Sequence, residues 1–226
     1  MNLVTTPCRA RLQPRDFEFI SATLAGSAEE RGFLASLFEE PAALDAILDN
    51  DRLFRAVMEL PMPLSISPEL YFFVLVRRSL KEAGIDDVEI ADYVAATLAE
   101  QAGGALAGRG SDRMPDAGFT YHVDIIERMN EASPCERFFL EVHCGNRFLV
   151  LTGLFPRFLE RRAERRGAPG LSYYESVARH SFRTAGLHPL ATDYAVREVY
   201  GRLAECFTET RRALNRMAES RLFLGS

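Results

Sequence analysis

Several residue types are scarce in this chain of 226 residues, and each scarcity argues against a class of protein. Tryptophan is absent, and there are only 15 glycines, 11 prolines and four cysteines. Collagen-like and low-complexity chains need far more glycine and proline. The cysteines form no C-x-x-C pair, which argues against a closely spaced structural zinc site, and they are too few for a disulfide framework in a chain of this length.

Long apolar runs are also missing from the sequence. No run approaches the roughly 18 residues that a membrane-spanning helix needs, so we expect no membrane partner. Residues 1–8 lack the basic and apolar regions of a secretory signal, and a cytoplasmic location is therefore expected. At 47% hydrophobic and 26% charged residues, the composition is that of an ordinary globular protein.

Lysine is nearly absent as well, because Lys81 is the only lysine among 27 basic residues. The formal charge of −5 disfavours a general nucleic-acid-binding protein, which would present a basic surface. The charge is uneven: residues 1–110 carry 10 basic and 17 acidic residues, whereas residues 111–226 carry 17 and 15. We therefore expect no nucleic-acid partner, and we expect a protein partner or self-association.

Helical periodicity is the feature that the sequence has in abundance. Apolar residues recur every three or four positions, and no long stretch alternates as a half-buried strand would. The pattern predicts an all-α protein, a multi-helix bundle of about nine or ten helices. The expected helices span residues 14–25, 28–39, 41–48, 51–59, 68–83, 87–102, 119–131, 134–166, 172–186 and 189–222.

Residues typical of helix ends support several of these boundaries. Ser27–Glu30, Ser133–Glu136 and Ser172–Glu175 fit a capping box, in which the serine and glutamate side chains accept hydrogen bonds from the first turn of the backbone. Gly84 and Gly186 stand where a left-handed residue is expected to end a helix. These local signals make the helical prediction independent of apolar periodicity alone.

The domain organisation depends on a polar, glycine-rich stretch at residues 103–118, where the charge balance changes. One interpretation is a surface loop within a single helical domain, 1–226, and we favour it because neither half shows enough short amphipathic helices to close a core. The other interpretation divides the chain into an acidic helical half, 1–102, and a second helical half, 119–226.

Segment 134–166 is apolar around most of its circumference, which is typical of a buried helix. Pro156 should bend it, because the proline ring removes one backbone donor and clashes with the carbonyl of Thr152. We therefore predict a central, long, proline-kinked helix around which the rest of the bundle packs. Its apolar residues include Phe138, Phe139, Leu140, Val142, Phe148, Leu149, Leu151, Phe155, Phe158 and Leu159.

Glu141 is the most unusual residue of this segment. At about 100° per residue, it shares a face with Phe148, Thr152 and Phe155. A carboxylate on an apolar face must be paired, hydrogen-bonded or protonated. One hypothesis is a metal ligand or a general acid/base inside the bundle. The alternative is an ion pair with Arg137, one turn earlier, or with an arginine of another helix.

Three histidines are the candidate partners of Glu141 in an internal polar or metal cluster. His122 falls on an apolar helix face, His143 lies on the more polar strip of segment 134–166, and His180 lies in the following helix. Each has an alternative interpretation as a hydrogen-bonded or solvated residue with no ligand role. No catalytic residue can be assigned from these spacings.

Known metal-binding spacings are absent from the sequence. Di-iron bundles use Glu-x-x-His on two helices, and here Cys144 stands three residues after Glu141 where a histidine is required. His-Glu-x-x-His is also missing. A transition metal is kept as a cofactor hypothesis only because Glu141 and the histidines could still converge in space.

An arginine-rich run, Arg157–Arg166, could meet an anion or an acidic partner, and the acidic first half of a second copy is one such partner. Glu160 and Glu164 interrupt the run, so a solvated helix face with ion pairs is the alternative.

Two classes of function remain open. The first is a non-catalytic interaction or regulatory protein, which the charge asymmetry and the scarcity of catalytic motifs favour. The second is an enzyme or small-ligand binder, with or without a metal, whose site is centred on Glu141. The second class gains if Glu141 and at least two of His122, His143 and His180 come within about 5 Å of one point, in keeping with ligand bonds near 2 Å.

Overall fold

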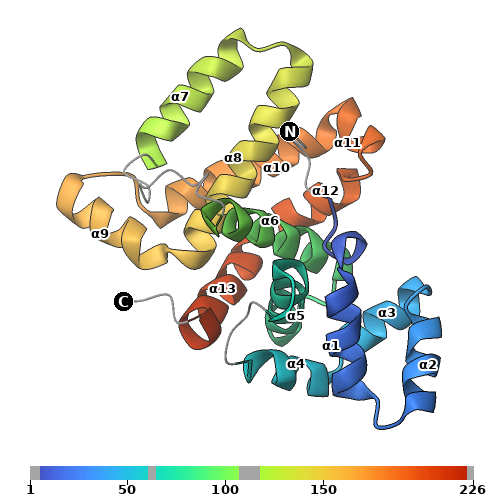
Figure 1. Ribbon diagram of the computed structural model, residues 1–226. Helices are drawn as coiled ribbons and strands as arrows, with labels where there is room; N and C mark the ends of the chain where they lie inside the picture. Colours follow the sequence, from blue (N-terminus) through green and yellow to red (C-terminus); the bar gives the residue numbers. More distant parts are fainter. Residues whose placement is uncertain (1–5, 61–64, 107–117, 223–226) are drawn as a thin grey trace. The chain divides into compact units, whose positions relative to one another are not determined.

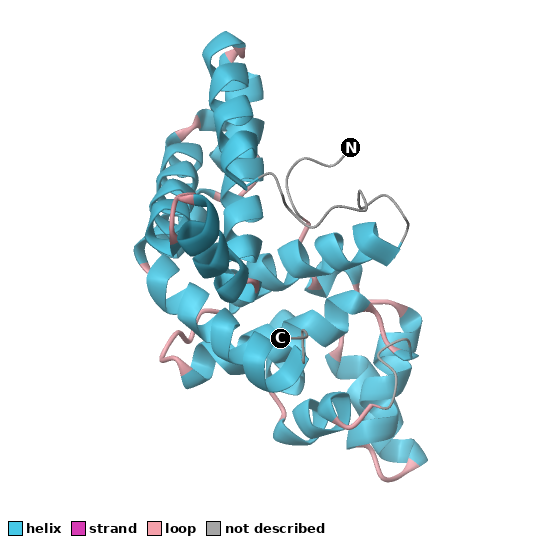
Figure 2. Ribbon diagram, turned by 90° about the vertical axis from the view of Figure 1, so that its left-hand side faces the viewer, coloured by secondary structure: helices cyan, strands magenta, loops and turns pink. Residues whose placement is uncertain are grey.

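The structure is a computed structural model that describes residues 6–60, 65–106 and 118–222 (Figure 1). Side chains are described for residues 6–60, 65–102 and 123–222. Every regular element in these ranges is a helix, so the all-α prediction is confirmed for the described residues (Figure 2). Within the same ranges, no helix combines the length and the apolarity that crossing a membrane requires.

The helices are more numerous than predicted, because thirteen α-helices, not nine or ten, lie in the described residues. Segment 134–166 accounts for one of the additional helices. It forms α8 (Pro134–Leu154) and α9 (Pro156–Arg166), and the backbone leaves the helical region at Phe155, with φ −126° and ψ 45°. The prediction of one kinked helix is corrected to two helices, because Pro156 starts a new helix, within which the N–H of the first residue would have no partner.

The C-terminal segment, predicted as one helix over 189–222, is also divided. Ala195 has a positive φ of 54°, which separates α11 (Pro189–Asp193) from α12 (Arg197–Glu205). Cys206, with φ −95° and ψ 20°, separates α12 from α13 (Phe207–Met217), which continues into a π-helical turn over Ala218–Leu222. The apolar stripe continues through both breaks, which is why periodicity alone joined them.

The chain divides into two compact units, and the boundary falls between Gly104 and Ala105, in the last turns of α6 (Val88–Leu106). This boundary lies in the segment that we predicted to be a loop, and the prediction of one domain stays a prediction. The N-terminal unit, Thr6–Gly104, carries 9 basic and 17 acidic residues, a net charge of −8. The C-terminal unit, Ala105–Ser226, carries 18 and 15, a net charge of +3.

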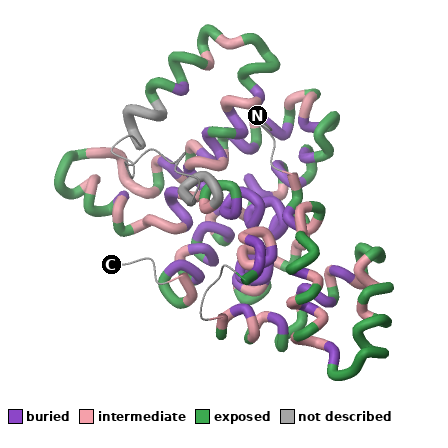
Figure 3. Tube along the Cα trace, in the orientation of Figure 1, coloured by how far each residue is buried: buried purple, intermediate pink, exposed green. Residues whose placement is uncertain are grey.

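The N-terminal unit contains six α-helices in its described residues. Its most buried helices are α5 and α6 (Figure 3). In α6, every residue of Ile90–Ala99 is buried. By contrast, α2 has no buried residue. The six helices are α1 (Pro14–Leu24), α2 (Ala28–Leu37), α3 (Pro41–Leu48), α4 (Asp51–Met58), α5 (Pro68–Glu82) and α6.

A buried carboxylate joins the starts of α1 and α5. Asp16 is fully buried, and its two oxygens accept hydrogen bonds from the backbone amides of Gln13 and Ser67, both at 2.7 Å. The Ser67 hydroxyl in turn accepts from the Leu70 amide at 3.1 Å. Asp16 therefore satisfies backbone donors of two helix starts, and a carboxylate accepting from backbone amides is among the stronger hydrogen-bonding arrangements.

The C-terminal unit contains α7 (Gly118–Glu131), α8, α9, α10 (Leu171–Leu187), α11, α12 and α13. Helix α8 packs along α10 and α13, and α10 also packs along α12. Aromatic rings fill these contacts. Phe148 packs on Tyr174 at 5.1 Å between ring centres, and Phe182 packs on Tyr200 at 5.5 Å and on Phe207 at 6.2 Å.

Two glycines of α8 permit this close packing. A Cβ atom added at Gly145 would lie 3.0 Å from the ring of Phe182, and one added at Gly153 would lie 2.8 Å from the Leu214 side chain. Phe148 and Leu159 are buried and Phe155 is half-buried. Most of the apolar side chains of segment 134–166 are therefore buried or half-buried, as predicted.

The break at Pro156 leaves backbone carbonyls that α13 satisfies. Asn215 donates from its side-chain amide to the carbonyls of Thr152 at 2.8 Å and of Gly153 at 2.6 Å. Its Oδ1 accepts from Arg211 at 2.7 Å. The carbonyl of Thr152 is the one that an unbroken helix would pair with residue 156, so Asn215 replaces the donor that proline lacks.

Candidate functional site

Glu141 is buried on α8, as predicted, with 8% of its surface exposed. Burial raises the pKa of its carboxyl. Three groups lower this pKa in part: the Ser181 hydroxyl, by a hydrogen bond, and the nearby charges of His180 and Arg137. The alternative of an ion pair with Arg137 gains no support, because the Arg137 guanidinium donates to the Met129 carbonyl at 3.2 and 3.0 Å. Among the groups that lower the pKa of Glu141, the Ser181 hydroxyl on α10 has the largest effect.

Cys144 lies one turn after Glu141 and shares its partner. It is buried with 1% of its surface exposed, and burial raises the pKa of its thiol to about 11 despite a hydrogen bond with Ser181. Such a thiol is protonated at neutral pH and is a poor nucleophile. The group of Glu141, Cys144 and Ser181 therefore reads as a hydrogen-bonded contact between α8 and α10.

The two candidate histidines with described side chains, His143 and His180, lie in different environments. His180 is exposed on α10, near enough for its charge to act on Glu141, and 3.4 Å from the Thr184 hydroxyl. His143 of α8 is exposed, and loss of hydration together with the positive charges of Arg147 and Arg128 lowers its pKa.

The side chain of His122 lies outside the described residues. The proposed convergence of Glu141 with at least two histidines therefore finds only His180 among the described side chains. Across the described ranges, no group of three or more histidine, cysteine, aspartate or glutamate side chains could hold a metal ion. The metal hypothesis gains no support from these residues.

Glu175 has a different role from the predicted cap. Helix α10 begins at Leu171 with Gly170 as its N-cap, and no side chain caps it. The Glu175 carboxylate instead accepts hydrogen bonds from the Thr208 hydroxyl and from Arg211 at 2.8 Å. The capping prediction is wrong because partners on α13, distant in sequence, compete successfully for this carboxylate.

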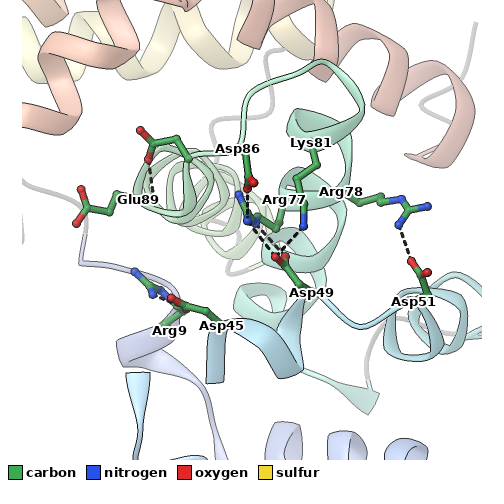
Figure 4. A network of polar contacts seen from close by, with 10 residues as sticks. Arg9, Asp45, Asp49, Asp51, Arg77, Arg78, Lys81, Asp86 and Glu89 are labelled. Carbon is green, nitrogen blue, oxygen red and sulfur yellow. Dashed lines mark hydrogen bonds and ion pairs between the residues drawn. The ribbon is translucent and has the colours of Figure 1, made fainter. Parts of the chain in front are cut away.

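An ion-pair pocket that the sequence analysis missed lies in the N-terminal unit (Figure 4). Its volume is about 240 Å³. Asp49 follows the last residue of α3 and accepts two hydrogen bonds from Arg77 of α5, both at 2.9 Å, and one from Lys81 at 3.1 Å. Arg77 also donates to Asp86 at 2.6 Å. The pocket is lined by Leu48, Asp49, Phe54, Val74, Arg77, Arg78, Lys81 and Glu82.

The charges of the ion-pair pocket stabilise one another. Burial opposes ionisation of Asp49, but hydrogen bonds and charges from Arg77 and Lys81 outweigh it, so the pKa of Asp49 is lowered. The same contacts raise the pKa of Arg77 against the effect of burial. At the rim, Arg78 pairs with Asp51 at 2.6 Å, and its guanidinium lies 5.2 Å from the centre of the Phe54 ring.

This network joins α3, α4 and α5, and that gives it a structural function. Asp49 and Arg77 are separated by 28 residues, so no local motif indicated the pair. The one available signal was the spacing of Arg77 and Lys81, which places two cations on one helix face after the acidic stretch at Asp49 and Asp51.

A second hollow, the α1–α2 groove, is largely apolar. It is about 500 Å³ in volume. Phe17 of α1 and Phe38, just after α2, meet across it with ring centres 4.8 Å apart. On α2 itself, Phe33 is 66% exposed. The groove is lined by Phe17, Glu18, Ser21, Ala22, Arg31, Ala35 and Phe38.

A third hollow, the arginine hollow, lies on α9 in the C-terminal unit. Its volume is about 240 Å³, and it is lined by Phe158, Arg161, Arg162, Arg165 and Arg166. The Arg162 guanidinium lies 5.8 Å from the centre of the Phe158 ring. The Arg157 side chain, outside the hollow, pairs with Glu219 at 3.4 Å.

Comparison with known proteins assigns no family to the chain. No protein-family model matches the sequence, and neither the curated proteins nor the solved structures that were searched contain a match. The function therefore has to be argued from the geometry of these sites.

Proposed function

We propose that the protein is a non-catalytic interaction protein whose N-terminal unit binds a basic, amphipathic helix of a partner in the α1–α2 groove. The observation that carries this proposal is the state of α2. Its last turns and the residue after it hold Phe33, Leu34, Leu37 and Phe38, yet none of them is buried. Covering apolar surface is favourable by about 25 cal/mol for each Å² removed from water, so a partner would gain energy there.

The shape and composition of the groove support a helical partner. Amphipathic helices place apolar anchors at positions i, i+3 or i+4 and i+7, and they bind in apolar grooves between two helices. Ala22 of α1 and Ala35 of α2 contribute small side chains to the lining of the groove, beside the contact between the Phe17 and Phe38 rings.

The charge around the groove supports a basic partner. Residues 14–40 carry six acidic and two basic residues, and the exposed ones include Glu18 in the groove and Glu29, Glu30, Glu39 and Glu40 at the ends of α2. A rim of this charge accelerates encounter with a cationic partner and disfavours an acidic one.

The position of Glu141 also supports the non-catalytic class. Ser181 of α10 lowers the pKa of the Glu141 carboxyl, while the charges of Arg147 and Arg128 act on His143. These neighbours support a packing function for Glu141 in the C-terminal unit.

The test uses the full chain and a fluorescent helical peptide of leucine and lysine, with leucines on one face. We expect binding by this peptide and little binding by a scrambled peptide of the same composition or by a leucine–glutamate version. Ala35→Arg, an exposed position that lines the groove, should weaken binding about tenfold or more. Ala46→Arg, exposed on α3 outside the groove, adds the same charge and should change affinity less than about twofold.

Two results would overturn the proposal. One is equal binding of the wild-type chain and the Ala35→Arg variant to the basic peptide. The other is a homodimer, measured by sedimentation equilibrium, that the Ala35→Arg substitution dissociates, because the occupant of the groove would then be a second copy.

A further inference from the structure

We propose that the arginine hollow on α9 binds a ligand that carries two or more phosphate groups. This inference is independent of the proposed function, because it concerns the C-terminal unit. It starts from the way the arginines are spaced. Arg161, Arg162 and Arg165 follow Phe158 at intervals of three, four and seven residues, so they share one face of the helix.

The acidic residues of α9 do not neutralise this face. At about 100° per residue, Glu160 and Glu164 fall on the side of the helix opposite Phe158. The lining of the hollow accordingly contains four arginines and no carboxylate. The alternative for the run as a whole, a solvated helix face with ion pairs, stays a prediction, and Arg157, outside the hollow, does pair with Glu219.

Two of the four guanidinium groups, those of Arg161 and Arg165, retain donors for a ligand. Arg161 uses its Nε to donate to the Arg157 carbonyl at 3.3 Å, which is one of its five N–H groups. Within the described part of the chain, no hydrogen bond or ion pair engages the side chain of Arg165, which is exposed. The two arginines therefore present planar sets of donors to the hollow.

The charge of the hollow selects the class of ligand. Four guanidinium groups place four positive charges around about 240 Å³. A carboxylate supplies one negative charge, whereas a phosphate monoester supplies about −1.5 to −2 and three acceptor oxygens. Two linked phosphates match the charge, and guanidinium forks bind phosphate oxygens in pairs. The ligand could be a free polyphosphorylated molecule or a phosphorylated lipid headgroup, which share this chemistry.

Isothermal titration calorimetry of the full chain with inorganic tripolyphosphate tests the proposal. Tripolyphosphate should bind at least about tenfold more tightly than inorganic phosphate, and added salt should weaken it. The double variant Arg161→Gln/Arg165→Gln should bind about tenfold less tightly or worse. The control Arg183→Gln/Arg212→Gln removes the same charge from exposed positions on α10 and α13 and should stay within about twofold of the wild type.

Co-sedimentation with phosphatidylcholine vesicles, with and without a phosphoinositide, distinguishes the two sources. Binding to phosphoinositide vesicles that tripolyphosphate competes away and that the Arg161→Gln/Arg165→Gln variant loses would assign the lipid headgroup. If the chain binds tripolyphosphate but does not bind the phosphoinositide vesicles, the ligand would be assigned as a free polyphosphorylated molecule. Absence of tripolyphosphate binding, or equal weakening in both double variants, would overturn the proposal.

Discussion

Removal of the Asn215 side-chain amide should destabilise the C-terminal unit by about 3–4 kcal/mol. The variant Asn215→Ala leaves the carbonyls of Thr152 and Gly153 without the donor that lies 2.8 and 2.6 Å away, and it removes an acceptor 2.7 Å from Arg211. Each neutral hydrogen bond contributes about 1 kcal/mol and one to a charged group about 1.5–3 kcal/mol. The higher helix propensity of alanine returns about 0.6 kcal/mol.

Urea denaturation measures this effect as a lower midpoint at an unchanged slope. Asn130→Ala, at an exposed position of α7, is the matched control and should stay within about 0.5 kcal/mol of the wild type. In a Pro156→Ala background, residue 156 regains an N–H that can pair with the Thr152 carbonyl. The cost of Asn215→Ala should then fall by about 1 kcal/mol. An equal cost in both backgrounds would refute the reasoning that Asn215 replaces the missing proline donor.

Two further predictions concern α8. Because the pKa of Glu141 is raised in the folded state, its ionisation opposes folding as pH rises above its ordinary value of about 4.3. The variant Glu141→Gln can still form a hydrogen bond with Ser181 but cannot ionise. In urea titrations, its free energy of unfolding should therefore rise relative to that of the wild type between about pH 4 and pH 7. A fall relative to the wild type over this range would contradict the raised pKa. Gly145→Ala should destabilise by about 1–3 kcal/mol, because its Cβ would lie 3.0 Å from Phe182. Gly201→Ala, helical and open to solvent, should stabilise by up to about 1 kcal/mol in thermal melts, and equal effects would refute the packing argument.

Local features of the fold were predictable from the sequence, because local hydrogen bonds determine them. Ser27 and Ser133 accept from the amides of Glu30 and Glu136, as their spacing predicted. Gly84 has the left-handed φ of 83° expected of a helix end. At each of these positions, residues within one turn supply all the partners.

Other features depended on partners that are distant in sequence. Gly186 was predicted to end a helix, but it lies within α10, where a Cβ atom would stand 3.3 Å from the Tyr200 side chain. Its lack of a side chain serves packing and not a turn.

The partner of Glu141 also had to come from the structure. The burial of Glu141 followed from its helix face, but Ser181 lies 40 residues further along the chain and no spacing rule indicated it. Apolar periodicity likewise continued through the break at Phe155, so the division of α8 from α9 was predicted only as a bend.

Hydrogen–deuterium exchange of the full chain, with and without the leucine–lysine peptide, tests the central claim about the α1–α2 groove most directly. We predict slower exchange of backbone amides in α1 and α2, and no comparable change with the leucine–glutamate peptide. Protection elsewhere with none in α1 or α2, or equal protection by both peptides, would contradict the assignment of this groove as a binding site for a basic helix.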